Sequence, residues 1–146
     1  MKLNMDFDKK VVISTNDLEW IPSPAKDVLR KPLEREAAES GHVSSIVKYE
    51  AGASFKTHHP PLGEEIFVLE GTFSDEFGDY PQGSYLRNPP GSSHAPYSKE
   101  GCTIFVKLNQ FDATDKKKVS IQTQKQQWLA GQGKLEVMPL HEHLGK

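Results

Sequence analysis

The sequence predicts a single all-β domain, a sandwich or barrel of antiparallel strands with little helix. The chain has 146 residues, which suits one domain of about 100–150 residues. Its apolar stretches are short and rich in Val, Ile, Phe, Tyr and Thr, and several alternate between two faces as strands do. Eleven Gly and ten Pro residues punctuate the chain. Many short strands separated by turn residues are typical of this fold class.

Three segments show the strand pattern most clearly, at residues 42–50, 65–73 and 102–108. In the second of them, Ile66 and Val68 share one face of the predicted strand, while Phe67 points to the other. Turn sequences rich in Gly, Pro, Asn and Asp lie around these strands, at residues 50–52, 59–63, 78–83 and 88–93.

Two further regions carry weaker patterns. Residues 25–40 are the only helix candidate, and Pro32 interrupts them, so we expect a short turn there or no helix at all. Residues 115–127 are polar and are interpreted as a solvated turn before a last strand. The similarity between residues 18–22 and 135–139 is either a coincidence or the start of a second copy of the domain.

The composition excludes several classes of function. Eighteen basic and twenty acidic residues give a net charge of -2, so no charge excess favours nucleic acid or an anionic membrane. The single Cys102 excludes an internal disulfide and a zinc knuckle of thiolates, and is expected to be a small core residue. The apolar runs fall far short of the roughly 20 residues of a membrane helix. We therefore expect a cytoplasmic protein.

Four side chains are candidate metal ligands: His58, His59, Glu64 and His94. Imidazole and carboxylate groups suit divalent first-row metals. These residues lie beside turns and on different predicted strands, so a barrel could bring them together at its mouth, where pockets often form. Side chains of this kind beside turns are also commonly just solvated, and the residue types alone leave both readings open.

The spacing of these residues matches two known motifs. The pattern Gly-x5-His-x-His-x3-Glu-x6-Gly fits from Gly52 to Gly71, except that Pro60 stands at the second His. The pattern Gly-x5-Pro-x-Gly-x2-His fits from Gly83 to His94 without gaps. The sequence thus resembles the cupin superfamily. The resemblance implies one cupin (jelly-roll-type) antiparallel β-barrel over residues 1–146, with its motif core at 52–108, an N-terminal arm and strands at 1–41, and a C-terminal strand and tail at 109–146.

A narrower resemblance covers residues 63–112. The phrases FSDE, GDYP and RNPPGSSH in this stretch are similar to the cupin domain of ChrR-type anti-sigma factors and their stand-alone relatives. More distantly, the layout and the QWLA sequence at 127–130 are similar to acetylacetone-cleaving dioxygenase cupins.

The cupin resemblance implies that His58, Glu64 and His94 bind one divalent metal ion (Zn, Fe, Mn or Ni). Pro60 cannot ligate through its side chain. A bulge before it would turn His59 inward as a fourth ligand, which we expect, whereas a regular strand would leave three ligands. A barrel without metal stays an alternative.

Weaker candidates surround this set. Glu65 is expected to face away from the metal; Tyr80 and Tyr97 are expected to pack at the barrel rim or to contact a ligand. His141 and His143 have the spacing of a metal-binding pair, but their position near the C-terminus argues against a separate site.

Two functions stay open. The protein is either an enzyme, with a metal-dependent dioxygenase of a diketone-like substrate as the candidate and Glu64 as ligand and proton acceptor, or a non-catalytic module that senses a metal or small molecule. A third reading is a vestigial cupin with a structural role only. The expected partners are a small-molecule ligand, a second copy in a homodimer and, for the sensing module, a regulatory protein.

Overall fold

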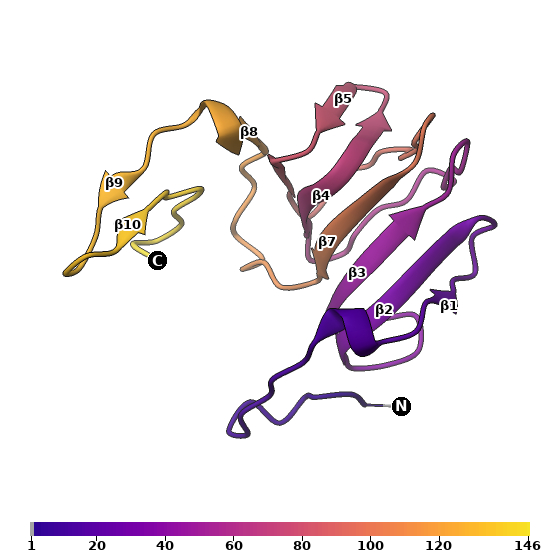
Figure 1. The fold of residues 1–146 in the computed structure, drawn as a ribbon, viewed down its shortest axis with the longest axis horizontal. Coiled ribbons are helices and arrows are strands. Elements are labelled where there is room, and N and C mark those ends of the chain that lie inside the picture. The colour runs from indigo at the N-terminus through magenta and orange to yellow at the C-terminus, as the bar shows by residue number, and fades with distance from the viewer. Residues whose placement is uncertain (1) are drawn as a thin grey trace.

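The computed structural model describes residues 2–146, and nearly all of its regular structure is β-strand (Figure 1). The elements, in chain order, are η1 (Thr15–Asp17), β1 (Ile21–Pro22), β2 (Val28–Arg35), β3 (Val43–Tyr49), β4 (Glu64–Asp75), β5 (Gly78–Pro81), β6 (Ser84–Asn88), β7 (Cys102–Leu108), β8 (Val119–Gln122), η2 (Thr123–Lys125), β9 (Leu129–Ala130) and β10 (Glu136–Val137). Among the described residues, no helix has the length and apolar character needed to cross a membrane.

Every strand pair is antiparallel, and the strands form the barrel that the sequence predicts. The main sheet has the order β1-β2-β3-β7-β4-β6-β8, with β5 paired to the far half of β4. The two motif regions are brought together because β4 pairs with β6 and because residues 58 and 94 form an isolated bridge. The predicted strands at 42–50, 65–73 and 102–108 correspond to β3, β4 and β7.

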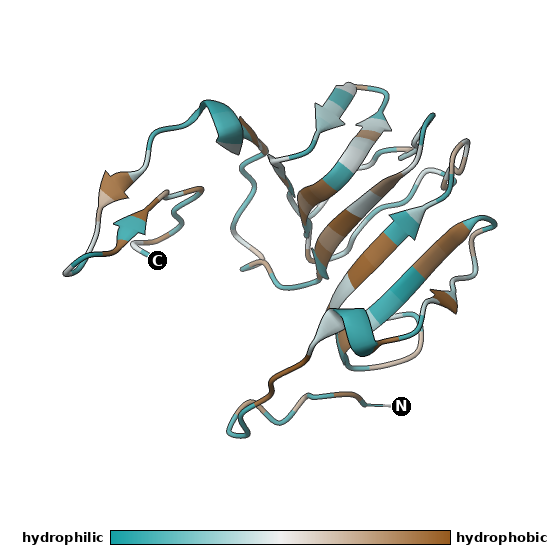
Figure 2. Cartoon of the chain, in the orientation of Figure 1, coloured by the Kyte–Doolittle hydropathy of each residue, from teal (hydrophilic) through white to brown (hydrophobic). Residues whose placement is uncertain are grey.

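The core lies on the inner face of this sheet, where alternate residues of each strand are buried. On β4 these are Ile66 and Val68, and on β7 they are Ile104 and Val106. Figure 2 shows brown apolar blocks along β2, β3, β4 and β7, with teal polar positions between or beside them on β2, β3 and β4. Cys102 is buried among these side chains, as expected of a small core residue.

Two regions contain strands that the sequence analysis did not single out. Residues 25–40 form no helix, as expected, and contain β2, which pairs with β1 on one side and β3 on the other. Pro32 is tolerated in it because the register shifts between Pro32 and Glu34, so the ladder is already interrupted there. Within the polar region at 115–127, residues Val119–Gln122 form β8 and extend the sheet beside β6.

The C-terminal hairpin of β9 and β10 projects away from the barrel (Figure 1). Its apolar side chains are exposed, namely Trp128, Leu129, Leu135 and Val137.

Gly71 marks the point where β4 leaves the main sheet and continues toward β5. The residue has a φ of +74°, and a Cβ at this position would collide with the carbonyl oxygen of Gly101. Gly52 also has a positive φ, of +83°, but its Cβ would meet no atom within 4 Å. Both glycines therefore need a left-handed backbone conformation, but only Gly71 lacks room for a Cβ atom.

We predict that Gly71→Ala destabilises the fold more than Gly52→Ala. The left-handed conformation costs a residue with a Cβ about 1–2 kcal/mol, and both variants incur this cost. Only Gly71→Ala must also move backbone. Urea unfolding of both variants measures the difference, and equal losses of unfolding free energy would show that the contact between residues 71 and 101 does not constrain the strand.

Candidate metal centre

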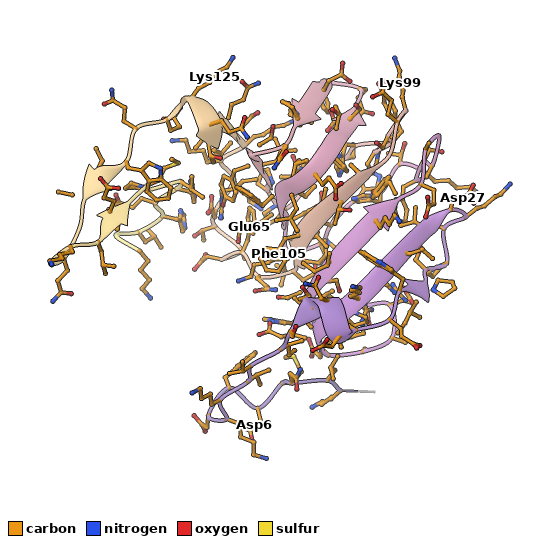
Figure 3. All side chains as sticks on the ribbon, viewed as in Figure 1. Asp6, Asp27, Glu65, Lys99, Phe105 and Lys125 are labelled. Atoms are coloured by element: carbon orange, nitrogen blue, oxygen red, sulfur yellow. The ribbon has the colours of Figure 1, made fainter. Side chains whose placement is uncertain are left out.

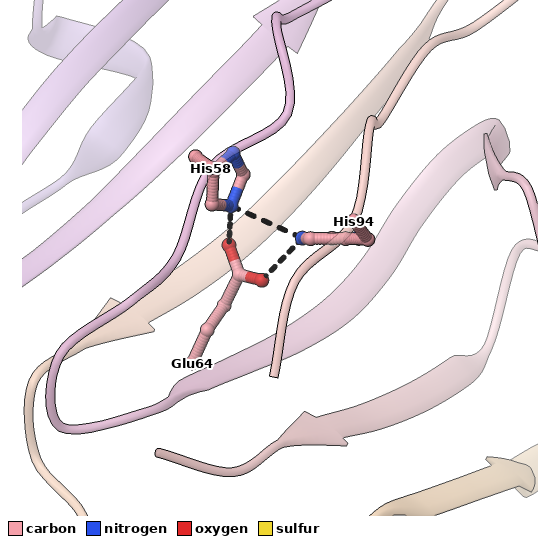
Figure 4. A group of neighbouring side chains, drawn as sticks. All are labelled: His58, Glu64 and His94. Carbon is pink, nitrogen blue, oxygen red and sulfur yellow. Dashed lines mark hydrogen bonds and ion pairs between the residues drawn. The ribbon is translucent and has the colours of Figure 1, made fainter. Parts of the chain in front are cut away.

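Three of the predicted ligands converge at one end of the barrel (Figure 4). Glu64 is the first residue of β4, while His58 and His94 lie in the segments before β4 and after β6. The two histidines form an isolated antiparallel bridge, in which the His58 amide donates to the His94 carbonyl at 3.0 Å. This backbone contact places the two imidazole rings side by side over Glu64.

The ligand atoms lie close enough to share one ion. His94 Nε2 is 2.8 Å from Glu64 Oε2 and 3.1 Å from His58 Nε2, and His58 Nε2 is 3.4 Å from Glu64 Oε1. A metal ion with ligands at about 2.1 Å separates neighbouring ligand atoms by about 3.0–3.4 Å. Two of the three separations fall in this range and the third, at 2.8 Å, is about 0.2 Å shorter, so a small shift of the Glu64 carboxylate would let one divalent ion fit.

Burial differs between the three candidate ligands. Glu64 and His94 are only 5% and 3% exposed, whereas His58 is half-buried. The His58 ring also packs edge-on against Phe55 and against the ring of His94. The site is therefore closed on the side of the sheet and approachable from the side of His58.

Asp75 orients His94 from behind. Its Oδ2 lies 3.1 Å from His94 Nδ1, so that ring nitrogen carries the proton and Nε2 points toward Glu64. Asp75 in turn accepts hydrogen bonds from the Phe77 amide and the Tyr80 hydroxyl, at 2.9 and 3.2 Å. Tyr80 thus contacts this carboxylate. A carboxylate behind a ligating histidine is the usual way to fix its tautomer in metal sites.

A hydrogen bond from Asn88 positions the Glu64 carboxylate. Asn88 Nδ2 donates to Glu64 Oε2 at 3.1 Å, and Asn88 faces Glu64 across the ladder between β4 and β6. Asp75 and Asn88 were not among the candidates predicted from the sequence. Asp75 lies in the phrase FSDE and Asn88 in RNPPGSSH, and in each case a short polar residue at the end of an apolar stretch is the only local pattern that indicates a role beside the site.

Charge is concentrated around His94. Burial raises the pKa of Glu64, but hydrogen bonds and charge from His58 and His94 outweigh it and lower that pKa to about 2. Burial lowers the pKa of His94, but hydrogen bonds to Asp75 and Glu64 outweigh it and raise that pKa to about 9. A cation at this position, whether a proton on His94 or a metal ion, is therefore favoured by two carboxylates.

His59 lies beside this group but outside it. Among residues 2–146, the side chains whose ligand atoms lie within 4.8 Å of one another here are His58, Glu64 and His94. His59 is exposed and lines the same cavity as His58. Residues 59 and 60 belong to no strand, so strand alternation does not fix the direction of the His59 side chain. Its role as a fourth ligand stays a prediction.

Glu65 faces away from the centre, as expected. Its carboxylate accepts a hydrogen bond from Tyr85 at 2.6 Å and pairs with Arg87 at 3.2 Å. Figure 3 places Glu65 on the side of the barrel toward the C-terminal strands.

The remaining candidates lie elsewhere. His141 bonds to Asp115 at 2.8 Å, and His143 lies 3.0 Å from the Thr114 hydroxyl, so both hold the C-terminal segment to the body. Tyr97 contributes backbone bonds to Ser74.

A cavity of about 400 Å³ adjoins the centre. His58, His59 and Glu64 lie at its metal-site end, and apolar side chains of β3 and β7 form much of its wall. The apolar residues on these strands are Val43, Val47, Tyr49, Ile104, Val106 and Leu108. A small molecule in this cavity would lie next to the ligand atoms.

Solved structures share this fold. The anti-sigma ChrR, in complex with SigE of Rhodobacter sphaeroides, matches with a TM-score of 0.54 and 18% identity over 65% of this chain and 51% of the matched chain. A candidate acetylacetone dioxygenase from Methylibium petroleiphilum PM1 matches with a TM-score of 0.61 and 17% identity over 80% and 92%. An RmlC-like cupin protein from Ralstonia eutropha JMP134 matches with a TM-score of 0.60 and 21% identity over 71% and 72%.

These identities are low, so the likeness concerns the fold, and the chain spans about half the length of the chain matched in the ChrR complex. No curated protein matches the sequence. The sequence model of the ChrR cupin-like domain matches residues 8–112, which include both motifs and all the ligands discussed above. Since this match covers well over half of the 146 residues, the chain belongs to the ChrR cupin-like domain family.

Proposed function

We propose that this protein binds one divalent metal ion through His58, Glu64 and His94 and holds a small molecule beside it in the barrel cavity. The observation that carries the proposal is the convergence of three ligand atoms at 2.8–3.4 Å, next to a cavity of about 400 Å³. The donor set of two imidazoles and one carboxylate suits Zn, Fe, Mn or Ni. When bound, such an ion supplies Lewis acidity to a small molecule in the cavity.

The chain's own residues have distinct tasks in this proposal. Glu64 stays ionised because the pKa of its carboxyl is about 2, which suits a ligand better than a proton acceptor. Asp75 holds the proton on His94 Nδ1 and leaves Nε2 for the metal. The apolar wall excludes water from the cavity and positions the carbon skeleton of a ligand.

Two finer functions are compatible with this site. A metal-dependent dioxygenase of a diketone-like substrate is supported by the apolar cavity and by the fold shared with the candidate acetylacetone dioxygenase. A sensing module with a regulatory protein partner is supported by the family and by the ChrR–SigE complex. In either case we propose a homodimer, in which a second copy would cover the exposed apolar hairpin described above.

We predict that His94→Ala and Glu64→Gln each weaken metal binding by about 100-fold or more, since each removes a buried ligand; changes behind the ligands alone cost 10–100-fold. Glu65→Gln is the matched control, because it changes the neighbouring carboxylate on the opposite face of β4. Zinc titration with a competing chromophoric chelator measures all three. Parent-like affinity in His94→Ala would place the metal elsewhere.

His59 is tested by comparing two adjacent histidines. If His59 completes the site, His58→Ala and His59→Ala both weaken zinc binding by at least about tenfold. If three ligands suffice, His58→Ala binds zinc much more weakly, whereas His59→Ala binds zinc with the affinity of the parent protein. We predict the first result, because Pro60 and Pro61 donate no backbone N–H and leave this segment free to turn His59 inward. Parent-like zinc affinity in His59→Ala, together with strongly reduced zinc affinity in His58→Ala, would show that His59 is not a fourth ligand.

Oxygen consumption separates the enzyme from the sensor. For the dioxygenase, we predict that iron(II)-loaded protein consumes oxygen when acetylacetone is added, and that His94→Ala abolishes this uptake because the iron is lost. An oxygen electrode measures the rate, with Glu65→Gln as the folded control. Stoichiometric iron binding without any oxygen uptake would favour the sensing module.

A further inference from the structure

A buried arginine and a buried serine face the cavity from the strands opposite β4. Arg35, the last residue of β2, is 8% exposed, and Ser45 on β3 is 1% exposed; both line the cavity. Within residues 2–146, Arg35 Nε and Ser45 Oγ have no hydrogen-bond partner. Buried polar groups in folded proteins are almost always paired, so two unpaired donors that face one cavity indicate a ligand that pairs with them.

The strand register connects Arg35 to the metal centre. Glu64 pairs with Leu108, Leu108 with Val43, and Val43 with Arg35, so these residues form one row across β4, β7, β3 and β2. The three steps amount to about 14 Å along the sheet at about 4.8 Å each. The direct distance is shorter, because the sheet curves. Ser45 lies in the adjacent row, two residues from Val43 on the same face.

The wall between these two polar positions is apolar. Leu108 and Val43 occupy the row between Glu64 and Arg35, and Val106 pairs with Ser45 in the next row. The cavity thus presents Arg35 and the Arg30–Glu39 ion pair at one end, the candidate metal ligands at the other and hydrocarbon between them.

The positive charge of Arg35 has no ion-pair partner among residues 2–146. Its Nη1 donates to the carbonyl of Ala38, whereas the nearby Glu39 is taken by Arg30 in a two-pronged pair at 2.5 and 3.2 Å. Burial and the charge of Arg30 lower the pKa of Arg35, whereas the charge of Glu39 raises it. Since Glu39 already pairs with Arg30 and makes no direct ion pair with Arg35, the buried guanidinium is only partly compensated, and an anionic ligand group would offset the remaining cost.

We propose that the cavity binds an organic acid whose carboxylate pairs with Arg35 and Ser45 and whose carbon chain runs along Val43, Leu108 and Val106 toward the metal centre. A carboxylate fits better than a phosphate, because one guanidinium and one hydroxyl offer the few donors that a planar, singly charged group requires. The carboxylate site stands on Arg35 and Ser45 alone. Only the role of the far end of the ligand rests on the metal site proposed above.

The test uses hexanoate and hexanamide as probes, since they share a chain length and differ in charge. Isothermal titration calorimetry is performed on the metal-free and the zinc-loaded protein. We expect hexanoate to bind at least tenfold more tightly than hexanamide. Arg35→Met should weaken hexanoate binding at least tenfold, and Ser45→Ala severalfold. Lys107→Met is the control that should change nothing, because Lys107 pairs with Ser44 and so belongs to the opposite face of the sheet.

The outcomes are decisive in both directions. Equal affinity for hexanoate and hexanamide, no binding of hexanoate, or unchanged hexanoate affinity in Arg35→Met would overturn the proposal. If Arg35→Met does not fold, the comparison of the two probes on the parent protein still decides it, and Arg35→Lys tests the need for the guanidinium fork. Failure of the metal site is distinguishable, since it would leave Arg35-dependent hexanoate binding in a protein that takes up no zinc.

Discussion

The geometry of the site depends on His94 being held between two carboxylates from the same strand. Glu64 begins β4 and contacts His94 Nε2, and Asp75 ends β4 and contacts His94 Nδ1. A straight strand of 12 residues would span about 36 Å, far too long for both ends to reach one ring. The strand must therefore bend. It does so at the register shift between Val68 and Glu70, followed by Gly71.

This bend gives one strand two tasks. Its first half, paired with β6 and β7, supplies Glu64 and the core residues Ile66 and Val68. Its second half, paired with β5, supplies Asp75. Glu64 and Asp75 come from one continuous strand, so the bend that closes this part of the sheet also brings both carboxylates to His94. Hydrogen bonds from Asn88, Phe77 and Tyr80 offset part of the cost of burying the two carboxylates, and a cation between them offsets more, which explains why the pKa of His94 is raised to about 9.

The sequence predicted the parts of this structure that local pattern determines. Alternating β-branched and aromatic residues predicted β3, β4 and β7, and the motif spacing singled out His58, Glu64 and His94. It did not predict β2, because Pro32 and its charged neighbours hide the inward-facing positions of that strand. Nor did it find Asp75, Arg35 or Ser45, whose roles arise from strand pairing between distant segments. The position of His59 is open for the same reason, since residues 59 and 60 belong to no strand.

The fold is common to this chain and the matched structures, and a shared fold does not fix a function. The central claim is that His58, Glu64 and His94 hold one ion. Anomalous diffraction from crystals of the zinc-loaded protein at the zinc absorption edge tests it most directly. The account predicts a single strong peak per chain, about 2.0–2.2 Å from His58 Nε2, His94 Nε2 and a Glu64 oxygen. A peak at His141 and His143, at Asp75 and Glu76 without Glu64, or at no position inside the barrel would contradict it.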